Sequence, residues 1–157
     1  MTEEKKTLLG QAIRSEIDSG EFYSAVANAV KNLLLVERMK FLANEEHKHE
    51  DFLRALYKKT FKEEPLVPDT TPVPTPKFVP GEKTRFSDLF TEAMQAEWDT
   101  SRFYLDLSKH FSGEEAKLLQ YLSMMEMGHY QILETEREMA LQFEDYENVN
   151  PLFHIGA

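Results

Sequence analysis

The chain has 157 residues, of which 41% are hydrophobic and 29% are charged, and its formal net charge is −10. This length suits one domain with a real core, and the acidic balance, with no visible basic face, argues against nucleic-acid binding. The absence of cysteine excludes disulfides, thiolate metal sites, iron–sulfur clusters and cysteine nucleophiles.

Two long segments that lack proline flank a proline-rich stretch, and each is predicted to form a helical hairpin. Six of the seven prolines lie within residues 65–80, where they cannot continue a helix. We predict helices at about 4–30 and 33–61, separated at the N-cap Asn32. Further helices are predicted at about 85–110 and 113–143, where Ser112 and Glu115 indicate a capping box.

The predicted fold is therefore all-α, a four-helix bundle within a single domain, 1–157. Its parts are an antiparallel hairpin 4–61, a crossover linker 64–82, a second antiparallel hairpin 85–143 and a tail 144–157 whose structure is left unassigned. Eighteen of the linker residues, extended at ~3.1 Å each, could span ~55 Å. A helix of 27 residues is only ~40 Å long, so the linker can return along the whole bundle.

Each predicted helix carries an apolar stripe at steps of three and four residues, and a carboxylate interrupts the middle of every stripe. Burying an unpaired charge is costly, so these interruptions require compensating partners. The first and third helices each contribute one glutamate, and the other two each contribute Glu-x-x-His. The six candidate residues are Glu16, Glu46, His49, Glu97, Glu126 and His129.

The two halves of the chain also repeat each other. AIRSEIDSGEFYSAVA, beginning at Ala12, aligns with AMQAEWDTSRFYLDLS, beginning at Ala93. The predicted turns stand about halfway between Glu16 and Glu46, and between Glu97 and Glu126. In an antiparallel hairpin, residues equally far from the turn lie side by side, so all six candidates should meet at one level of the bundle.

One Glu from each of two helices with Glu-x-x-His from each of the other two is the ligand set of the di-iron carboxylate bundles. Four carboxylates balance the charge of two divalent ions and can bridge them, while each imidazole supplies one nitrogen. We therefore predict two metal ions at Glu16, Glu46, His49, Glu97, Glu126 and His129. This donor set suits iron or manganese, so Fe/Fe, Fe/Mn and Mn centres all stay open.

Over about residues 5–142 the chain resembles the ferritin-like superfamily, and within it the rubrerythrin-like di-iron proteins. Glu16 followed by Tyr23, and the pairs Glu46/His49 and Glu126/His129, carry the resemblance. It implies a ferritin-like four-helix bundle whose six candidates ligate iron. It also implies an oxidoreductase that reduces peroxide or dioxygen, with no catalytic residues beyond the metal ligands.

Two departures from rubrerythrins qualify that expectation. Rubrerythrins carry a rubredoxin domain and this chain has none, so a separate electron-donor protein is expected. They also carry a further glutamate that exchanges with a histidine, and here Thr100 occupies its position. This puts the exchange, and with it efficient peroxide reduction, in question. Analogy with the family further implies a homodimer.

Other functions remain open from the sequence: an iron-handling ferroxidase, a hydroxylase of a lipid-like quinone, or a non-catalytic metal-binding bundle. Tyr23 and Tyr104 lie two turns beyond Glu16 and Glu97, either as hydrogen-bond donors to carboxylates or as core aromatics. Small residues one turn beyond the same glutamates leave room for an oxidant or allow close helix packing; they are Ser19, Gly20, Thr100 and Ser101.

Some of the polar residues outside the six candidates are expected at the surface. We predict a solvated face for the run ETERE, residues 134–138, and a solvated side chain for His47, while His154 matches no ligand spacing. No apolar run reaches the ~18 residues of a membrane span, and the N-terminus lacks a secretory signal. The expectation is a cytoplasmic protein without membrane contacts.

Overall fold

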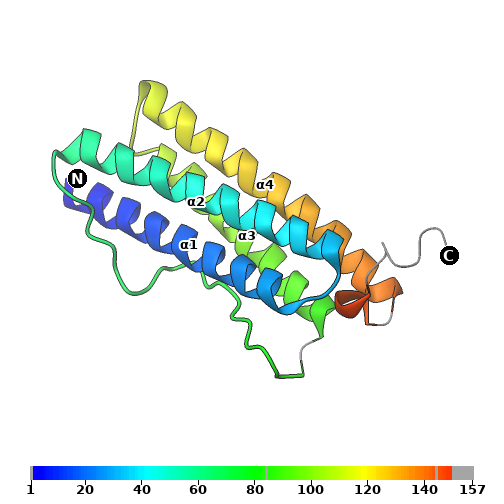
Figure 1. Ribbon diagram of the computed structural model, residues 1–157. Helices are drawn as coiled ribbons and strands as arrows, with labels where there is room; N and C mark the ends of the chain where they lie inside the picture. Colours follow the sequence, from blue (N-terminus) through cyan, green and yellow to red (C-terminus); the bar gives the residue numbers. More distant parts are fainter. Residues whose placement is uncertain (1, 84, 144, 150–157) are drawn as a thin grey trace.

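The structure is a computed structural model that describes residues 2–83, 85–143 and 145–149. Its elements are α1 (Thr2–Ala29), α2 (Leu33–Phe61), α3 (Phe86–Ser108), α4 (Gly113–Gln142) and a short 3₁₀ helix, η1 (Tyr146–Asn148). Figure 1 shows α1 with α2 and α3 with α4 as two hairpins that pack into one bundle. The predicted all-α bundle is confirmed, and each helix boundary falls within about two residues of its predicted place. Of the unassigned tail, the described part forms η1 and the residues that flank it.

The two hairpin turns differ in how well they are capped. The Asn32 side chain accepts hydrogen bonds from the amides of Leu34 (3.1 Å) and Leu35 (3.2 Å). Its amide group also donates to the carbonyl of Tyr146 (3.0 Å), which joins η1 to this turn. Ser112 is the N-cap of α4, but its side chain makes no capping hydrogen bond.

The predicted capping box at Ser112 is therefore wrong. The side chain of Glu115 instead forms an ion pair with Lys59 on α2, at 3.4 Å. The chain enters α4 through Gly113, whose φ of +62° lies in the left-handed region. A cross-hairpin ion pair and a glycine turn thus replace the local motif.

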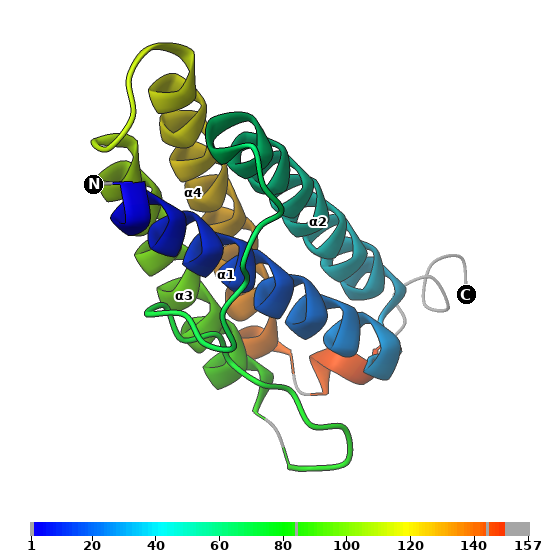
Figure 2. The same cartoon turned by 90° about the vertical axis from the view of Figure 1, so that its left-hand side faces the viewer.

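The crossover runs along the outside of α1, as Figure 2 shows. Arg14 on α1 donates a hydrogen bond from Nε to the carbonyl of Pro68 (2.7 Å). The close approach depends on Gly10, because a Cβ there would lie 2.4 Å from the carbonyl oxygen of Leu66. Val73 of the crossover is buried.

The core consists of two apolar clusters at opposite ends of the bundle. In every helix the candidate ligands lie between residues of the two: Glu16, for example, lies between Ile13 of one cluster and Phe22 of the other. The apolar ends therefore enclose one polar level. Burial of these side chains supplies the main folding energy, at roughly 25 cal/mol per Å².

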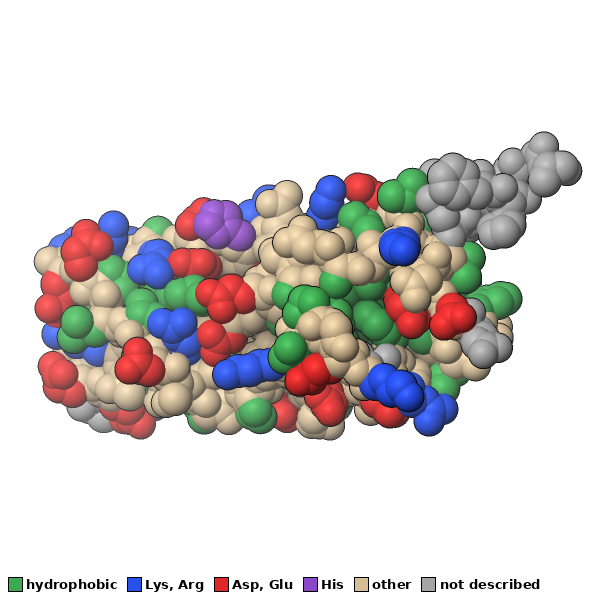
Figure 3. All heavy atoms as spheres, turned by 60° about the horizontal axis from the view of Figure 1, so that its bottom comes forward, with side chains coloured by type: hydrophobic (Ala, Val, Ile, Leu, Met, Phe, Trp, Pro, Cys, Tyr) green, Lys and Arg blue, Asp and Glu red, His purple; other side chains and the backbone are tan. Residues whose placement is uncertain are grey.

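The surface is charged in both signs. On the face drawn in Figure 3, acidic and basic side chains are interspersed, with smaller apolar areas between them. None of the described helices is long and apolar enough to cross a lipid bilayer.

Candidate metal centre

The six predicted ligands meet at the middle of the bundle, although they come from four helices. The six residues are between 1% and 6% exposed. We call this set the Glu–His cluster; its members are Glu16 on α1, Glu46 and His49 on α2, Glu97 on α3, and Glu126 and His129 on α4. The three-residue step from each glutamate to its histidine puts both side chains on one helix face.

Ligand atoms in the Glu–His cluster form two overlapping groups, each spanning at most 4.8 Å. Glu16 and His49 belong to the first group, and Glu97 and His129 to the second. Glu46 and Glu126 belong to both. Each group could hold a cation, and the two groups share two carboxylates.

The two hairpins exchange contacts across the cluster. His49 Nδ1 on α2 lies 3.0 Å from an oxygen of Glu126 on α4, and His129 Nδ1 on α4 lies 2.8 Å from an oxygen of Glu46 on α2. The two imidazole rings are stacked, with centroids 5.6 Å apart and an interplanar angle of 8°. The histidine of each hairpin therefore contacts a glutamate of the other hairpin, in keeping with the internal repeat.

The tyrosines bridge the hairpins in the same reciprocal way. The hydroxyl of Tyr23 on α1 donates a short hydrogen bond to Glu97 on α3, and that of Tyr104 on α3 donates one to Glu16 on α1. The sequence left open whether these tyrosines donate hydrogen bonds to carboxylates or are only core aromatics, and the structure shows that both donate. The second oxygens of Glu16 and Glu97 are buried and have no hydrogen-bond partner.

Those two orphaned oxygens test whether the site suits a cation. Each lies 3.7 or 3.8 Å from a histidine Nδ1, too far for a hydrogen bond, whereas buried polar atoms are normally satisfied. A cation bound at each group would give the Glu16 and Glu97 carboxylates a charged partner. The oxygen and nitrogen donors match hard or borderline divalent ions. The residues present therefore fit a metal centre.

The four carboxyl groups form two pairs whose pKa values are shifted in opposite directions. Burial opposes ionisation of Glu16, but its interactions with Glu46, His49 and the Tyr104 hydroxyl lower its pKa to about 2. Burial likewise opposes ionisation of Glu97, and the same kinds of partner lower its pKa. Burial, and then repulsion from the other carboxylates, raise the pKa values of Glu46 and Glu126 well above the ordinary range.

The histidines favour the protonated form. Burial alone would lower the pKa of His49, but its contacts with Glu126 and Glu16 raise it to about 10. Burial opposes the charge of His129 too, and contacts with three glutamates raise its pKa strongly. Without metal, the cluster therefore holds protons that a cation must displace.

Three further residues considered in the sequence analysis are His47, Thr100 and His154. His47 has an exposed side chain, as predicted, and lies 3.7 Å from both Glu50 and Asp51. Thr100 is buried and its hydroxyl donates to the backbone of Ala96 (2.8 Å). It brings no further carboxylate to the cluster. His154 lies outside the described residues.

The prediction of a solvated face for residues 134–138 is wrong at Glu136. This side chain is 5% exposed, accepts a hydrogen bond from the hydroxyl of Tyr146, and lies 3.6 Å from Arg38. The burial of Glu136 could have been predicted from its spacing, because it follows His129 by seven residues and Leu133 by three. It therefore continues the inward stripe of α4.

Comparisons with known proteins agree with this geometry. A family model described as rubrerythrin matches residues 7–137. A solved structure of a hypothetical protein from Pyrococcus furiosus is 38% identical, with a TM-score of 0.81 over 88% of this chain and 90% of that one. No curated protein gave a significant match.

Proposed function

The chain belongs to the rubrerythrin family, and from this premise we propose that it is a non-haem di-iron protein that reduces hydrogen peroxide or dioxygen. The observation that carries the proposal is the buried Glu–His cluster, in which two cation sites share Glu46 and Glu126. Shared carboxylates hold two ions close together, which suits a two-electron reaction.

In the proposed site, Glu46 and Glu126 would be shared by the two ions. Glu16 with His49 would hold one ion, and Glu97 with His129 would hold the other. Four carboxylates then balance the charge of two divalent ions. Each ion would have four protein ligands, fewer than iron commonly accepts, which leaves a position for a small substrate.

Two bound ferrous ions would supply the two electrons that, with two protons, convert hydrogen peroxide to two molecules of water. The protein's own contribution is to position and shield the site. Tyr104 donates a hydrogen bond to one oxygen of Glu16, and Tyr23 donates one to an oxygen of Glu97. These bonds fix the orientation of the two carboxylates, as hydrogen-bond partners of metal ligands do. The apolar clusters at both ends exclude bulk water.

The electrons must come from outside the chain in this proposal. The sequence has no cysteine, so it cannot hold the thiolate iron centre through which a rubredoxin-like domain passes electrons. We therefore propose a separate electron-donor protein as a partner.

The test is metal analysis followed by anaerobic reduction and addition of peroxide. We expect about two iron atoms per chain and an absorption band of an oxo-bridged iron pair in the oxidised protein. Peroxide should reoxidise the ferrous protein faster than it oxidises free ferrous ion. If the rates are equal, the peroxidase proposal fails; continued uptake of iron with dioxygen as oxidant would instead indicate a ferroxidase.

Neighbouring glutamates offer a matched control. Glu46→Gln should lose iron and the absorption band. Glu45→Gln should keep both, since Glu45 is only partly buried and lies 3.5 Å from Lys48. Equal iron content in the two variants would contradict the assignment of Glu46 as a ligand.

A further inference from the structure

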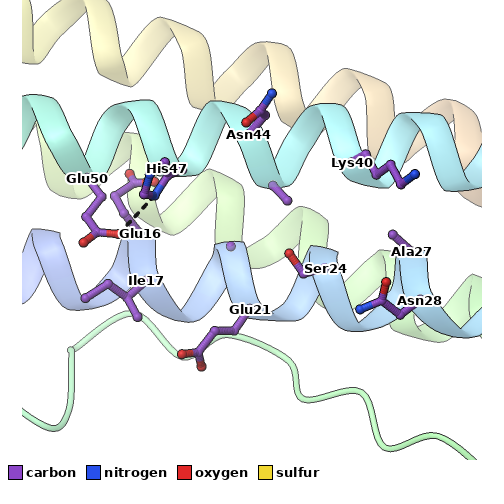
Figure 4. Close-up of a pocket in the computed structure, with 12 residues that line it drawn as sticks. Glu16, Ile17, Glu21, Ser24, Ala27, Asn28, Lys40, Asn44, His47 and Glu50 are labelled. Carbon is purple, nitrogen blue, oxygen red and sulfur yellow. Dashed lines mark ion pairs between the residues drawn. The ribbon is translucent and has the colours of Figure 1, made fainter.

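A groove of about 660 Å³ opens between α1 and α2 and leads inward to Glu16. Figure 4 shows its lining. Ser24, Asn28, Lys40 and Asn44 line it together with Gly20 and Glu16. We call this feature the α1–α2 groove. It brings solvent-facing space to one member of the Glu–His cluster.

Gly20 lies one turn beyond Glu16 and lines the α1–α2 groove. A Cβ at this position would lie 3.8 Å from the Cβ of Glu46 and 4.0 Å from the carbonyl oxygen of Ala43. A methyl group would fit at ordinary contact distance, whereas a longer side chain would occupy the space that leads to the cluster.

The corresponding position of the second hairpin carries a buried, hydrogen-bonded side chain. In the internal repeat Ser101 is the counterpart of Gly20, and it is buried. Its hydroxyl donates to the backbone carbonyl of Ser123 (3.0 Å) and lies 2.9 Å from the hydroxyl of the same residue. These contacts join α3 to α4 one turn beyond Glu97. The two halves thus have equivalent candidate ligands but differ at the residue one turn beyond Glu16 and Glu97.

A second groove, of about 360 Å³, lies between α2 and α4 and reaches His49. Its lining is largely apolar and includes Phe52, Leu118, Leu122 and Met125. This groove therefore reaches the cluster at His49 and at none of its four carboxylates. The α1–α2 groove reaches the carboxylate of Glu16; His47 also lines it, with an exposed side chain 3.7 Å from Glu50 and Asp51.

The lining of the α1–α2 groove indicates what kind of molecule it admits. Hydroxyl and amide groups of Ser24, Asn28 and Asn44 offer hydrogen bonds. Glu21, Glu50 and Lys40 line it too, and Glu50 forms an ion pair with Arg54 at 2.8 Å. With Glu16, the lining holds more carboxylates than cations, which favours a small uncharged molecule over an anion.

We propose that the α1–α2 groove is the entrance by which a small uncharged oxidant, of the size of hydrogen peroxide or dioxygen, reaches the Glu–His cluster from the Glu16 side. The proposal rests on the function proposed above. It adds that the oxidant meets the ion held by Glu16 and His49 first, and that Gly20 keeps its path open.

The test measures binding of nitric oxide, an uncharged diatomic probe, to the ferrous protein by stopped-flow absorbance. Gly20→Leu should reduce the association rate about tenfold, since the groove must then open before the probe can pass. The matched control is Gly128→Leu on α4, where an added Cβ meets nothing within 4 Å. It should bind the probe at the rate of the unsubstituted protein.

Iron content, measured first in every variant, separates the two proposals. If the unsubstituted protein binds no iron, the proposed function fails and the entrance fails with it. If Gly20→Leu retains iron and binds nitric oxide at the unchanged rate, the entrance alone is refuted.

If Gly20→Leu loses iron, the variant Ser24→Trp tests the entrance instead. Ser24 is exposed and lines the groove one turn further from the cluster, so a large side chain there covers the groove without touching a ligand. Slower binding with full iron content supports the entrance, and an unchanged rate overturns it.

Discussion

The hydrogen bond from Tyr104 to Glu16 allows a quantitative test of how the metal-free protein tolerates its buried charges. Tyr104 is fully buried and its hydroxyl donates to a carboxylate whose pKa is about 2. The other oxygen of Glu16 has no hydrogen-bond partner. Tyr104→Phe keeps the ring and removes this donor. Because hydrogen bonds to charged groups contribute ~1.5–3 kcal/mol, we expect the free energy of unfolding to fall by about 2 kcal/mol.

Tyr57 provides a matched control in the same apolar cluster. It is also fully buried, but its hydroxyl has no hydrogen-bond partner. Tyr57→Phe removes an unsatisfied polar atom and should change stability by between zero and about 1 kcal/mol in the stabilising direction. Two chemically identical substitutions in one core are thus expected to have opposite effects.

Urea denaturation of the chelator-treated protein at pH 7 measures both variants under the same conditions. For a chain of this length, a loss of 2 kcal/mol should also lower Tm by roughly 4–8 °C. If the two variants have equal stability within about 0.5 kcal/mol, the hydrogen bond to Glu16 does not stabilise the protein and the reasoning is refuted.

Three further predictions concern the ends of the bundle and the crossover. Asn32→Ala removes an N-cap and a bond to η1 and should cost ~1–2 kcal/mol, whereas Ser112→Ala, which removes no capping bond, should cost less than ~0.5 kcal/mol. Gly10→Ala would drive a Cβ to 2.4 Å from the Leu66 carbonyl oxygen and should cost ~1–3 kcal/mol, with faster proteolysis of the crossover. Burial raises the pKa of Glu136, so the native state binds its proton more tightly than the unfolded state does. The stability of the unsubstituted protein should therefore fall relative to Glu136→Gln as the pH rises from 4.5 to 8.

Thermal and urea denaturation check these three predictions. Equal costs for the Asn32 and Ser112 substitutions would contradict the capping difference. A Gly10→Ala variant with unchanged stability would show that the crossover does not need its close approach. A stability difference between Glu136→Gln and the unsubstituted protein that stays constant with pH would contradict the raised pKa of Glu136.

The local features of the fold followed directly from the sequence. Proline placement located the crossover, and steps of three and four residues located the helices. The repeat placed Glu16, Glu46, Glu97 and Glu126 at one level, because equal distances from a hairpin turn mean equal heights along an antiparallel pair. The resemblance to rubrerythrins is confirmed over residues 7–137.

Other features depended on how the four helices pack together. Gly20 and Ser101 are equivalent in the repeat. From the sequence, the small size of both residues was compatible with an access route and with close helix packing. In the structure one lines a groove and the other bonds to Ser123. Which outcome a small residue produces depends on the separation of the two helices beside it, and side chains from distant segments set that separation.

Helical geometry converts spacing into position, so the spacing of residues was enough to predict which of them share a helix face and a height in the bundle. The atomic contacts between elements required the folded structure: Tyr23 with Glu97, Tyr104 with Glu16, and the buried Glu136 with Tyr146. Hydrogen bonds form over about 3 Å, and that precision arises when all four helices pack together, because no single helix specifies how its neighbours are rotated.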